Sequence, residues 1–475
     1  MLWELEVALA RSAGRLSRLA RRGGGTTLPG KLLSAIEPDA LRRLARSLPD
    51  GIVLLSATNG KTTTAAMVAE ILQGTVPLAH NRSGANLVSG ITSALLEAHG
   101  ARLGLFEVDE LAFPPVAAQT RPRTVWLGNL FRDQLDRYGE LEQIAERWRT
   151  AVDSLPAEAT IVVNADDPVL GALGRDRDRV LRFGLDDPAV GHDRLSHAAD
   201  SKYCVACGSP LDYAVSYVGH LGDYRCPVCD AARAPLDVAA REIDLHGLDG
   251  SAFELVTPAG AVRVELALPG LYNVYNAVGA AALATALDAS LDEIAEGLAR
   301  FRPAFGRFER IAAGDRELLI LLIKNPAGAN EAVRTIVAAD TPGVAVVALN
   351  DEIADGRDVS WIWDVDFEPL AGCLQHLIAT GSRAEELALR FKYGGLDEGR
   401  IEVVHELAAA LDRGLELTPP GGVLPVLPTY TAMLALRAVA VSRGLVDPYW
   451  KPGPGPPAGA SSGLHSPGRK GGLKS

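Results

Sequence analysis

The chain has 475 residues, of which 48% are hydrophobic and 22% are charged, and its formal net charge at pH 7 is −12. This length predicts two or three domains, at roughly 150 residues each, and the composition is that of a soluble globular protein with sizeable cores. The acidic balance argues against a nucleic-acid partner, because binding to a phosphate backbone requires a basic surface. Four of the five cysteines form two Cys-x-x-Cys pairs, which indicates a metal site in a reducing compartment rather than disulfides.

Residues 1–50 are predicted to form an N-terminal helical segment. An amphipathic helix with an arginine face is expected over residues 2–22, and a second short helix over residues 38–48. Glu4, Glu6 and the arginines interrupt the apolar residues, so this is no secretory signal and we expect a cytoplasmic protein. We interpret the arginine face as the solvated side of a helix packed on the first domain. Peripheral contact with the inner face of a membrane is the alternative.

The motif that organises the chain is Thr58-Asn-Gly-Lys-Thr-Thr63, which lies between an apolar run at 52–55 and a helical pattern that continues to Leu72. A strand, a tight turn and a helix in this order direct backbone N–H groups toward a phosphate. We therefore predict ATP binding, with the lysine on the β- and γ-phosphates and a threonine hydroxyl on Mg²⁺. An ordinary strand-to-helix turn with a surface lysine is the alternative. The predicted ATP-binding residues of the motif are Thr58, Asn59, Gly60, Lys61, Thr62 and Thr63.

From Gly51 to about residue 200, strand and helix patterns alternate, which predicts a parallel sheet with crossover helices. One strand ends at Glu107, which is therefore placed to hold Mg²⁺ together with Thr62. Asp133 and Asp136 follow the next strand, and we expect them near the same edge of the sheet. For these two aspartates, helix capping and a role in catalysis are both open.

Two cysteine knuckles interrupt this pattern within about residues 200–232. Cys204 and Cys207 are followed, 18 residues later, by Cys226 and Cys229. This spacing predicts a zinc ribbon. Because four thiolates fill a tetrahedral coordination sphere, the predicted Zn²⁺ is structural and not catalytic.

The predicted α/β fold has a central domain over 51–300 and a second α/β domain over 301–450, followed by a disordered tail over 451–475. Asn273 and Asn276 lie one turn apart where an alanine-rich helix begins, and either adenine recognition or capping would explain them.

Cys373 and His376 could share a helix face, but we interpret them as core residues and not as a catalytic cysteine–histidine pair.

Several of these motifs, in this order and spacing, resemble the Mur ligases. Such enzymes phosphorylate a carboxylate with ATP and then let an amine displace the phosphate. The matching segments are Thr58–Thr63, the strand end at Glu107, Asn129–Gly139, Asn164–Pro168, Asn273–Ala277 and Gly306–Glu309.

Within that family, the cysteine insertion, the run Lys324–Glu331 and the run Asp355–Asp364 resemble the ATP-using subunit of lipid II isoglutaminyl synthase. The resemblance implies that ammonia from a GatD-type glutamine amidotransferase partner amidates the D-glutamate α-carboxyl of lipid II at the membrane surface. Two departures from ordinary Mur ligases are Gln134, where a histidine is common, and the lack of any lysine between Asp136 and Asn164. They put a second magnesium site in doubt.

The resemblance also implies residue roles. Lys61 and Glu107 would take part in phosphoryl transfer, Asn276 and Arg307 would contact adenine and phosphate, and Lys324 would hold phosphate or substrate. Asp355, or failing that Asp358, would complete the catalytic Cys-His pair of the partner. Two alternatives remain: a stand-alone amino acid ligase of the Mur or folylpolyglutamate type, and a non-catalytic nucleotide-binding scaffold of an amidotransferase.

Overall fold

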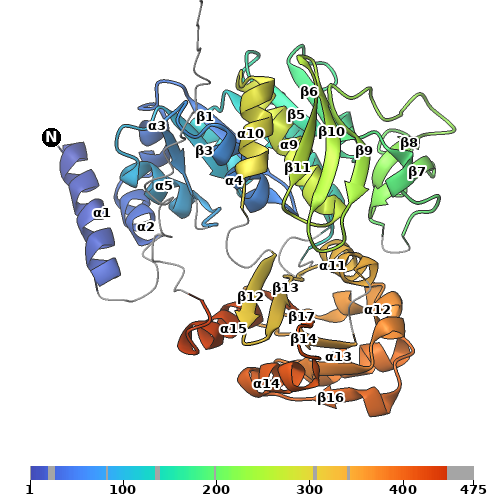
Figure 1. Cartoon of the computed structure of the whole chain (residues 1–475). Helices are drawn as coiled ribbons and strands as arrows, with labels where there is room; N and C mark the ends of the chain where they lie inside the picture. The colour runs from blue at the N-terminus through green and yellow to red at the C-terminus, as the bar shows by residue number, and fades with distance from the viewer. Residues whose placement is uncertain are drawn as a thin grey trace, which may run out of the picture.

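The computed structural model contains two α/β units, each built on one sheet, with a group of helices at the N-terminus (Figure 1). The structure describes residues 2–19, 27–81, 84–133, 140–196, 199–302, 308–339 and 343–446. Arg307, Asp136, Gln134 and the predicted tail over 451–475 lie outside the described residues. None of the described helices combines the length and the apolar composition that crossing a bilayer requires.

Three helices precede the first strand: α1 (Leu2–Leu19), α2 (Leu28–Ile36) and α3 (Ala40–Ala45). The sequence analysis did not predict α2, which has Pro29 in its first turn and Gly30 directly after it. Proline is tolerated in the first turn of a helix, and the glycine lets α2 approach the next layer closely. A Cβ at Gly30 would lie 1.9 Å from the carbonyl oxygen of Ser89.

The first sheet has the strand order β11-β10-β9-β6-β5-β4-β1-β3-β2. Within this spatial order, the strands from β9 across to β2 pair in parallel, and β10 and β11 extend the sheet beyond β9 as an antiparallel edge. This confirms the predicted parallel sheet. The strands are β1 (Ile52–Ser56), β2 (Leu78–His80), β3 (Leu103–Glu107), β4 (Thr124–Leu127), β5 (Thr160–Asn164), β6 (Val180–Leu185), β9 (Val238–Leu245), β10 (Ser251–Thr257) and β11 (Gly260–Leu266).

Helices cover both faces of this sheet, because successive side chains of a strand point to opposite faces. Val53 and Leu55 of β1 pack with α4, α9 and α10, whereas Ile52 and Leu54 pack with α3, α5, α6 and α8. The alanine-rich α9 is buried along most of its length, which explains its uncharged sequence. The helices are α4 (Lys61–Ile71), α5 (Val88–Glu97), α6 (Phe113–Thr120), α8 (Leu141–Asp153), α9 (Leu271–Ala286), α10 (Leu291–Arg300) and the short η1 (Leu170–Ala172) and η2 (Pro188–Val190).

The cysteine insertion forms a separate hairpin of β7 (Asp212–Val218) and β8 (Leu221–Arg225) beside the first sheet (Figure 1).

The second unit lies beneath the first in Figure 1 and is coloured gold to red. Its sheet has the order β12-β13-β17-β14-β15-β16, parallel except for β12. The strands are β12 (Glu309–Ala313), β13 (Arg316–Ile320), β14 (Val344–Ala348), β15 (His376–Thr380), β16 (Ile401–Val403) and β17 (Val423–Pro428). The helices are α11 (Pro326–Ala338), η3 (Ser360–Asp364), α12 (Glu368–Cys373), α13 (Ala384–Tyr393), η4 (Glu398–Arg400), α14 (Leu407–Leu417) and α15 (Tyr430–Ser442).

The prediction that Cys373 and His376 could share a helix face was wrong. α12 ends at Cys373 and His376 begins β15, so the two residues lie on different elements. Both side chains are exposed, which also contradicts the predicted core packing. Only two residues, Leu374 and Gln375, separate the helix end from the strand start here, and hydrophobic periodicity does not reveal such short connections.

Candidate active site

The P-loop motif forms the expected turn between β1 and α4. Gly60 is the N-cap of α4 with φ +85°, a left-handed conformation that glycine adopts without strain. Lys61 is the first residue of the helix, two residues earlier than the sequence pattern indicated. The backbone N–H groups of this first helical turn therefore face the carboxyl edge of the sheet, where an anion is stabilised.

The lysine and the threonine that we predicted to act on ATP and Mg²⁺ both contact carboxylates. The Nζ of Lys61 lies 2.8 Å from the Oε2 of Glu110 and also donates to the carbonyl oxygen of Ala57. The hydroxyl of Thr62 donates to the Oε2 of Glu107, which is buried at the end of β3. A hydroxyl and a carboxylate side by side provide the hard oxygen ligands that Mg²⁺ prefers, so this pair fits the predicted magnesium site.

Asn276 packs directly against the P-loop. It is buried on α9, its Nδ2 donates to the Oδ1 of Asn273 at 3.1 Å, and the hydroxyl of Thr64 lies 3.4 Å from its Oδ1. A Cβ on Gly60 would come within 2.1 Å of the same Oδ1. The structure therefore brings Asn276 to the P-loop, whereas its predicted contact with adenine stays a prediction.

The second unit completes the site from the opposite side. Lys324, in the connection from β13 to α11, forms an ion pair with Asp133 at 2.6 Å. The neighbouring Asn325 exchanges two amide hydrogen bonds with Asn59 of the P-loop, at 3.0 and 3.2 Å. Sequence reasoning singled out Lys324 and Asp133 separately but did not pair them.

Asp133 is 7% exposed and lies in the segment that follows β4. Burial raises the pKa of its carboxyl above the ordinary value, while the nearby charge of Lys324 opposes that effect. Asp136 lies outside the described residues, so its position near the same edge stays a prediction.

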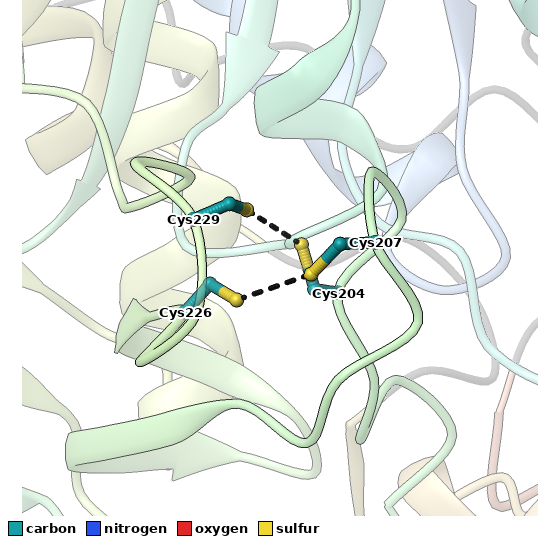
Figure 2. A group of neighbouring side chains, drawn as sticks. All are labelled: Cys204, Cys207, Cys226 and Cys229. Atoms are coloured by element: carbon teal, nitrogen blue, oxygen red, sulfur yellow. Dashed lines mark hydrogen bonds between the residues drawn. The ribbon is translucent and has the colours of Figure 1, made fainter.

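The four cysteines converge into a cluster in which all four sulfur atoms lie within 4.8 Å of one another (Figure 2). Cys204 and Cys229 are 3.6 Å apart, and Cys207 and Cys226 are 3.4 Å apart, so neither pair is a disulfide. A tetrahedral site with zinc–sulfur bonds of about 2.3 Å separates its sulfurs by about 3.8 Å. The cluster therefore fits Zn²⁺ with all four ligands supplied by protein, which is a structural site.

A buried carboxylate pair joins this ribbon to the active site, and sequence reasoning gave it no role. Asp166 accepts from Tyr275 at 2.7 Å and from Arg233 at 3.0 Å, and burial raises the pKa of its carboxyl to about 6. Asp167 accepts from the N–H of Leu130 at 2.9 Å and lies 3.4 Å from the Nε2 of His220. The hairpin, α9 and the segment after β4 thus share one polar junction.

The two aspartates of the acidic loop differ in their surroundings. Asp355 is buried and accepts from both the N–H and the hydroxyl of Thr431, near the start of α15. Asp358 is exposed and accepts from the N–H of Ser360 at 2.9 Å. Hydrogen bonds from the side chain and the backbone N–H of Ser360 lower the pKa of its carboxyl. Only Asp358 is therefore accessible to another protein in this arrangement.

Comparison with known proteins agrees with these features. The family described as the Mur ligase middle domain matches residues 56–221, and the family described as MurT ligase C-terminal matches residues 322–433. The chain is 34% identical over 451 residues to the lipid II isoglutaminyl synthase (glutamine-hydrolyzing) subunit MurT of Streptococcus pneumoniae, covering 93% of this chain and 98% of the relative. It is 31% identical over 433 residues to the corresponding subunit of Staphylococcus aureus strain N315, covering 89% of this chain and 95% of the relative.

Among solved structures, a pseudomurein peptide ligase type C from Methanothermus fervidus has a TM-score of 0.65 and 22% identity, and the match covers 82% of this chain and 78% of that one. This likeness concerns the fold, and it confirms the predicted Mur ligase architecture with a C-terminal α/β domain. The MurT relatives match over almost their whole length, and they confirm the narrower resemblance. The chain belongs to the MurT family of Mur-ligase-like subunits of lipid II isoglutaminyl synthase.

Proposed function

We propose that this chain is the ATP-dependent ligase subunit that amidates the D-glutamate α-carboxyl of lipid II in peptidoglycan biosynthesis, using ammonia from a glutamine amidotransferase partner. The observation that carries the proposal is the intact P-loop, with Thr62 beside Glu107, opposite Lys324 of the second unit. The relatives that match over nearly their full length are named as subunits of a glutamine-hydrolysing lipid II synthase.

The residues at the P-loop support phosphoryl transfer. ATP would bind with its phosphates at the start of α4, and Lys61 would exchange its contact with Glu110 for one with a phosphate. A magnesium ion held by Thr62 and Glu107 would neutralise phosphate charge. An oxygen of the substrate carboxylate attacks the γ-phosphorus and ADP leaves, which gives an acyl phosphate. Ammonia then bonds to the acyl carbon, and phosphate leaves with the electron pair of the broken carbon–oxygen bond.

Lys324 lies where it can hold the transferring phosphoryl group or the acyl phosphate. Its side chain is one-third exposed, and it comes from the second unit, one residue before the amide pair that ties Asn325 to Asn59. A cation at this position favours the negative charge that develops on the phosphoryl oxygens. Lys324 can reach the site only while the two units stay together. The closed arrangement of the two units would also limit the access of water to the acyl phosphate.

The partner is proposed to be a GatD-type amidotransferase that docks on the acidic loop between Asp351 and Asp364. Ile353 is 75% exposed, and Trp363 packs against the 72% exposed Tyr393 with ring centroids 6.0 Å apart. Exposed aromatic and aliphatic side chains of this kind are typical anchors of protein interfaces. Asp358 lies on the same loop and is our candidate for the aspartate that orients the histidine of the partner. Asp355 becomes the second choice, because Thr431 occupies its carboxylate.

The test compares nitrogen donors. The purified chain with lipid II and ATP should form amidated lipid II with ammonium chloride, and with glutamine only when the partner is added. Asp358→Asn should abolish the glutamine-dependent reaction and leave the ammonium-dependent one intact, whereas Asp355→Asn should chiefly lower stability. Turnover with a free amino acid, in the absence of both ammonium and glutamine, would indicate a stand-alone ligase. Nucleotide binding without turnover would indicate a scaffold.

A further inference from the structure

The segment that carries Asp133 is fixed to the P-loop by backbone and side-chain hydrogen bonds. The N–H of Thr58 donates to the carbonyl oxygen of Asn129 at 3.0 Å, and the N–H of Asn59 donates to the Oδ1 of Asn129 at 2.9 Å. The N–H of Phe131 donates to the hydroxyl of Thr58 at 3.0 Å. Because these bonds end two residues before Asp133, the fold sets the position of this segment relative to the P-loop.

The surroundings of Asp133 differ from those of the other buried carboxylates nearby. Glu107 accepts from Thr62, and Glu110 is paired with Lys61, so both carboxylates face the P-loop. Asp133 instead faces the second unit, and its Oδ2 lies 2.6 Å from the Nζ of Lys324. Its Oδ1 is buried and accepts no hydrogen bond from any described residue. This oxygen therefore has an unused capacity to accept a proton at the junction of the two units.

The amidation step needs a proton acceptor at this junction. When neutral ammonia bonds to the acyl carbon of an acyl phosphate, its nitrogen becomes positively charged and must lose a proton before the amide forms. Water cannot serve freely as that acceptor, because water admitted to the site would hydrolyse the acyl phosphate. A buried carboxylate with an unoccupied oxygen meets the requirement.

We propose that Asp133 is the general base of the amidation step and accepts a proton from the ammonia nitrogen as that nitrogen bonds to the acyl carbon. The carbon–nitrogen bond forms and the carbon–oxygen bond to phosphate breaks. The electron pair leaves with phosphate, and one proton moves from nitrogen to the Oδ1 of Asp133. The inference rests on the proposed function, since it assigns a residue to the second half of that reaction.

The electrostatics around Asp133 suit this task. Burial raises the pKa of its carboxyl and so does the negative charge of Glu110, while the positive charges of Lys324 and Lys61 lower it. The net effect is a raised pKa, which brings the carboxyl toward the neutral range in which a general base is most effective. Lys324 also places a positive charge beside the acceptor, which disfavours the ammonium cation and favours neutral ammonia.

The test separates the two half-reactions in the full chain. Single-turnover ADP formation from ATP and lipid II, without ammonia, measures acyl phosphate formation. Amidation is then started with ammonium chloride and followed across pH at a constant concentration of neutral ammonia. Asp133→Asn should form ADP within about threefold of wild type but amidate about a hundredfold or more slowly, the range that general bases contribute. Its amidation rate should also lose the rise with pH that the wild type shows.

Two further variants complete the design. Glu331→Gln is a matched control, because Glu331 is also buried and ion-paired, and burial raises the pKa of its carboxyl as well. It differs from Asp133 in that its partner, Arg334, lies on the same helix. The Glu331→Gln variant should amidate like wild type. If Asp133→Asn does not fold, Asp133→Ala with added formate provides the alternative, since a small carboxylate should restore part of the amidation rate.

Equal losses of ADP formation and amidation in Asp133→Asn would reduce Asp133 to a positioning role and overturn the inference. Amidation by Asp133→Asn at the wild-type rate would also overturn it. Absence of ADP formation in the wild type would instead refute the proposed function, and the inference with it.

Discussion

The close packing of Gly60 against Asn276 gives the sharpest test of how the P-loop is built. Replacing Gly60 by alanine forces a residue with a Cβ into φ +85°, which costs roughly 1–2 kcal/mol. The new Cβ would also lie 2.1 Å from the Oδ1 of Asn276, so that side chain must move. Asn276 would then lose its bond to Asn273 and its contact with Thr64, at roughly 1 kcal/mol each. The combined cost is about 3–4 kcal/mol.

Part of this cost falls on the nucleotide site, because the residues displaced are those around the phosphate-binding turn. We expect Gly60→Ala to bind ADP about tenfold or more weakly, since 1.4 kcal/mol corresponds to a factor of about ten. Isothermal titration calorimetry would measure the affinity, and the shift in melting temperature with ADP would check it, because bound ligand stabilises the folded state.

Gly74→Ala is the matched control. Gly74 has φ +84°, almost the same as Gly60, but a Cβ there would meet no atom within 4 Å. It should therefore carry the backbone strain alone and bind ADP like the wild type. Wild-type ADP affinity in Gly60→Ala, or equal loss of affinity in both variants, would refute the packing argument.

Three further predictions concern the zinc cluster, the buried carboxylates and the junction of the two units. Removing the metal with a chelator, or Cys226→Ser, should lower the melting temperature, whereas Cys373→Ser should not, because Cys373 is exposed and outside the cluster. Burial raises the pKa of Asp166 from 3.8 to about 6, so between these two pH values the folded state binds more protons than the unfolded state. The free energy of unfolding should therefore fall as the pH rises from 3.8 to about 6, by about 3 kcal/mol at most. Asp166→Asn should flatten that slope in urea titrations, and an unchanged slope would assign it to other groups. Asn325→Ala removes both the amide pair with Asn59 and the N-cap bond to Gly328, so it should cost about 2 kcal/mol. Asn325→Asp keeps the cap and loses only the amide donor, so it should cost less, and equal losses in the two variants would contradict a contribution from the cap.

The parts of the site that could be predicted from sequence are those encoded by contiguous residues. The P-loop is one such case, because strand, turn and helix are adjacent in the chain. The position of Glu107 near the P-loop could also be predicted, since the carboxyl ends of neighbouring parallel strands meet at one edge of a sheet. The cluster of four cysteines could likewise be predicted from the spacing of its two Cys-x-x-Cys pairs.

The contacts that sequence did not reveal are those between distant segments. Asn59 and Asn325 are 266 positions apart, and no local pattern indicates that their amides pair. The choice between Asp355 and Asp358 depended on burial, which the polar character of the whole loop concealed. Asp166 and Asp167 look like a turn in sequence, yet they join the hairpin, α9 and the segment after β4.

The central claim is that ATP activates a carboxylate of lipid II as an acyl phosphate that ammonia then displaces. Lipid II labelled with ¹⁸O in the D-glutamate α-carboxyl tests it most directly, with the purified chain, ATP and ammonium chloride. The account predicts amidated lipid II and one ¹⁸O atom in each molecule of inorganic phosphate released. Amidated product with unlabelled phosphate, or phosphate release that does not depend on lipid II, would contradict it.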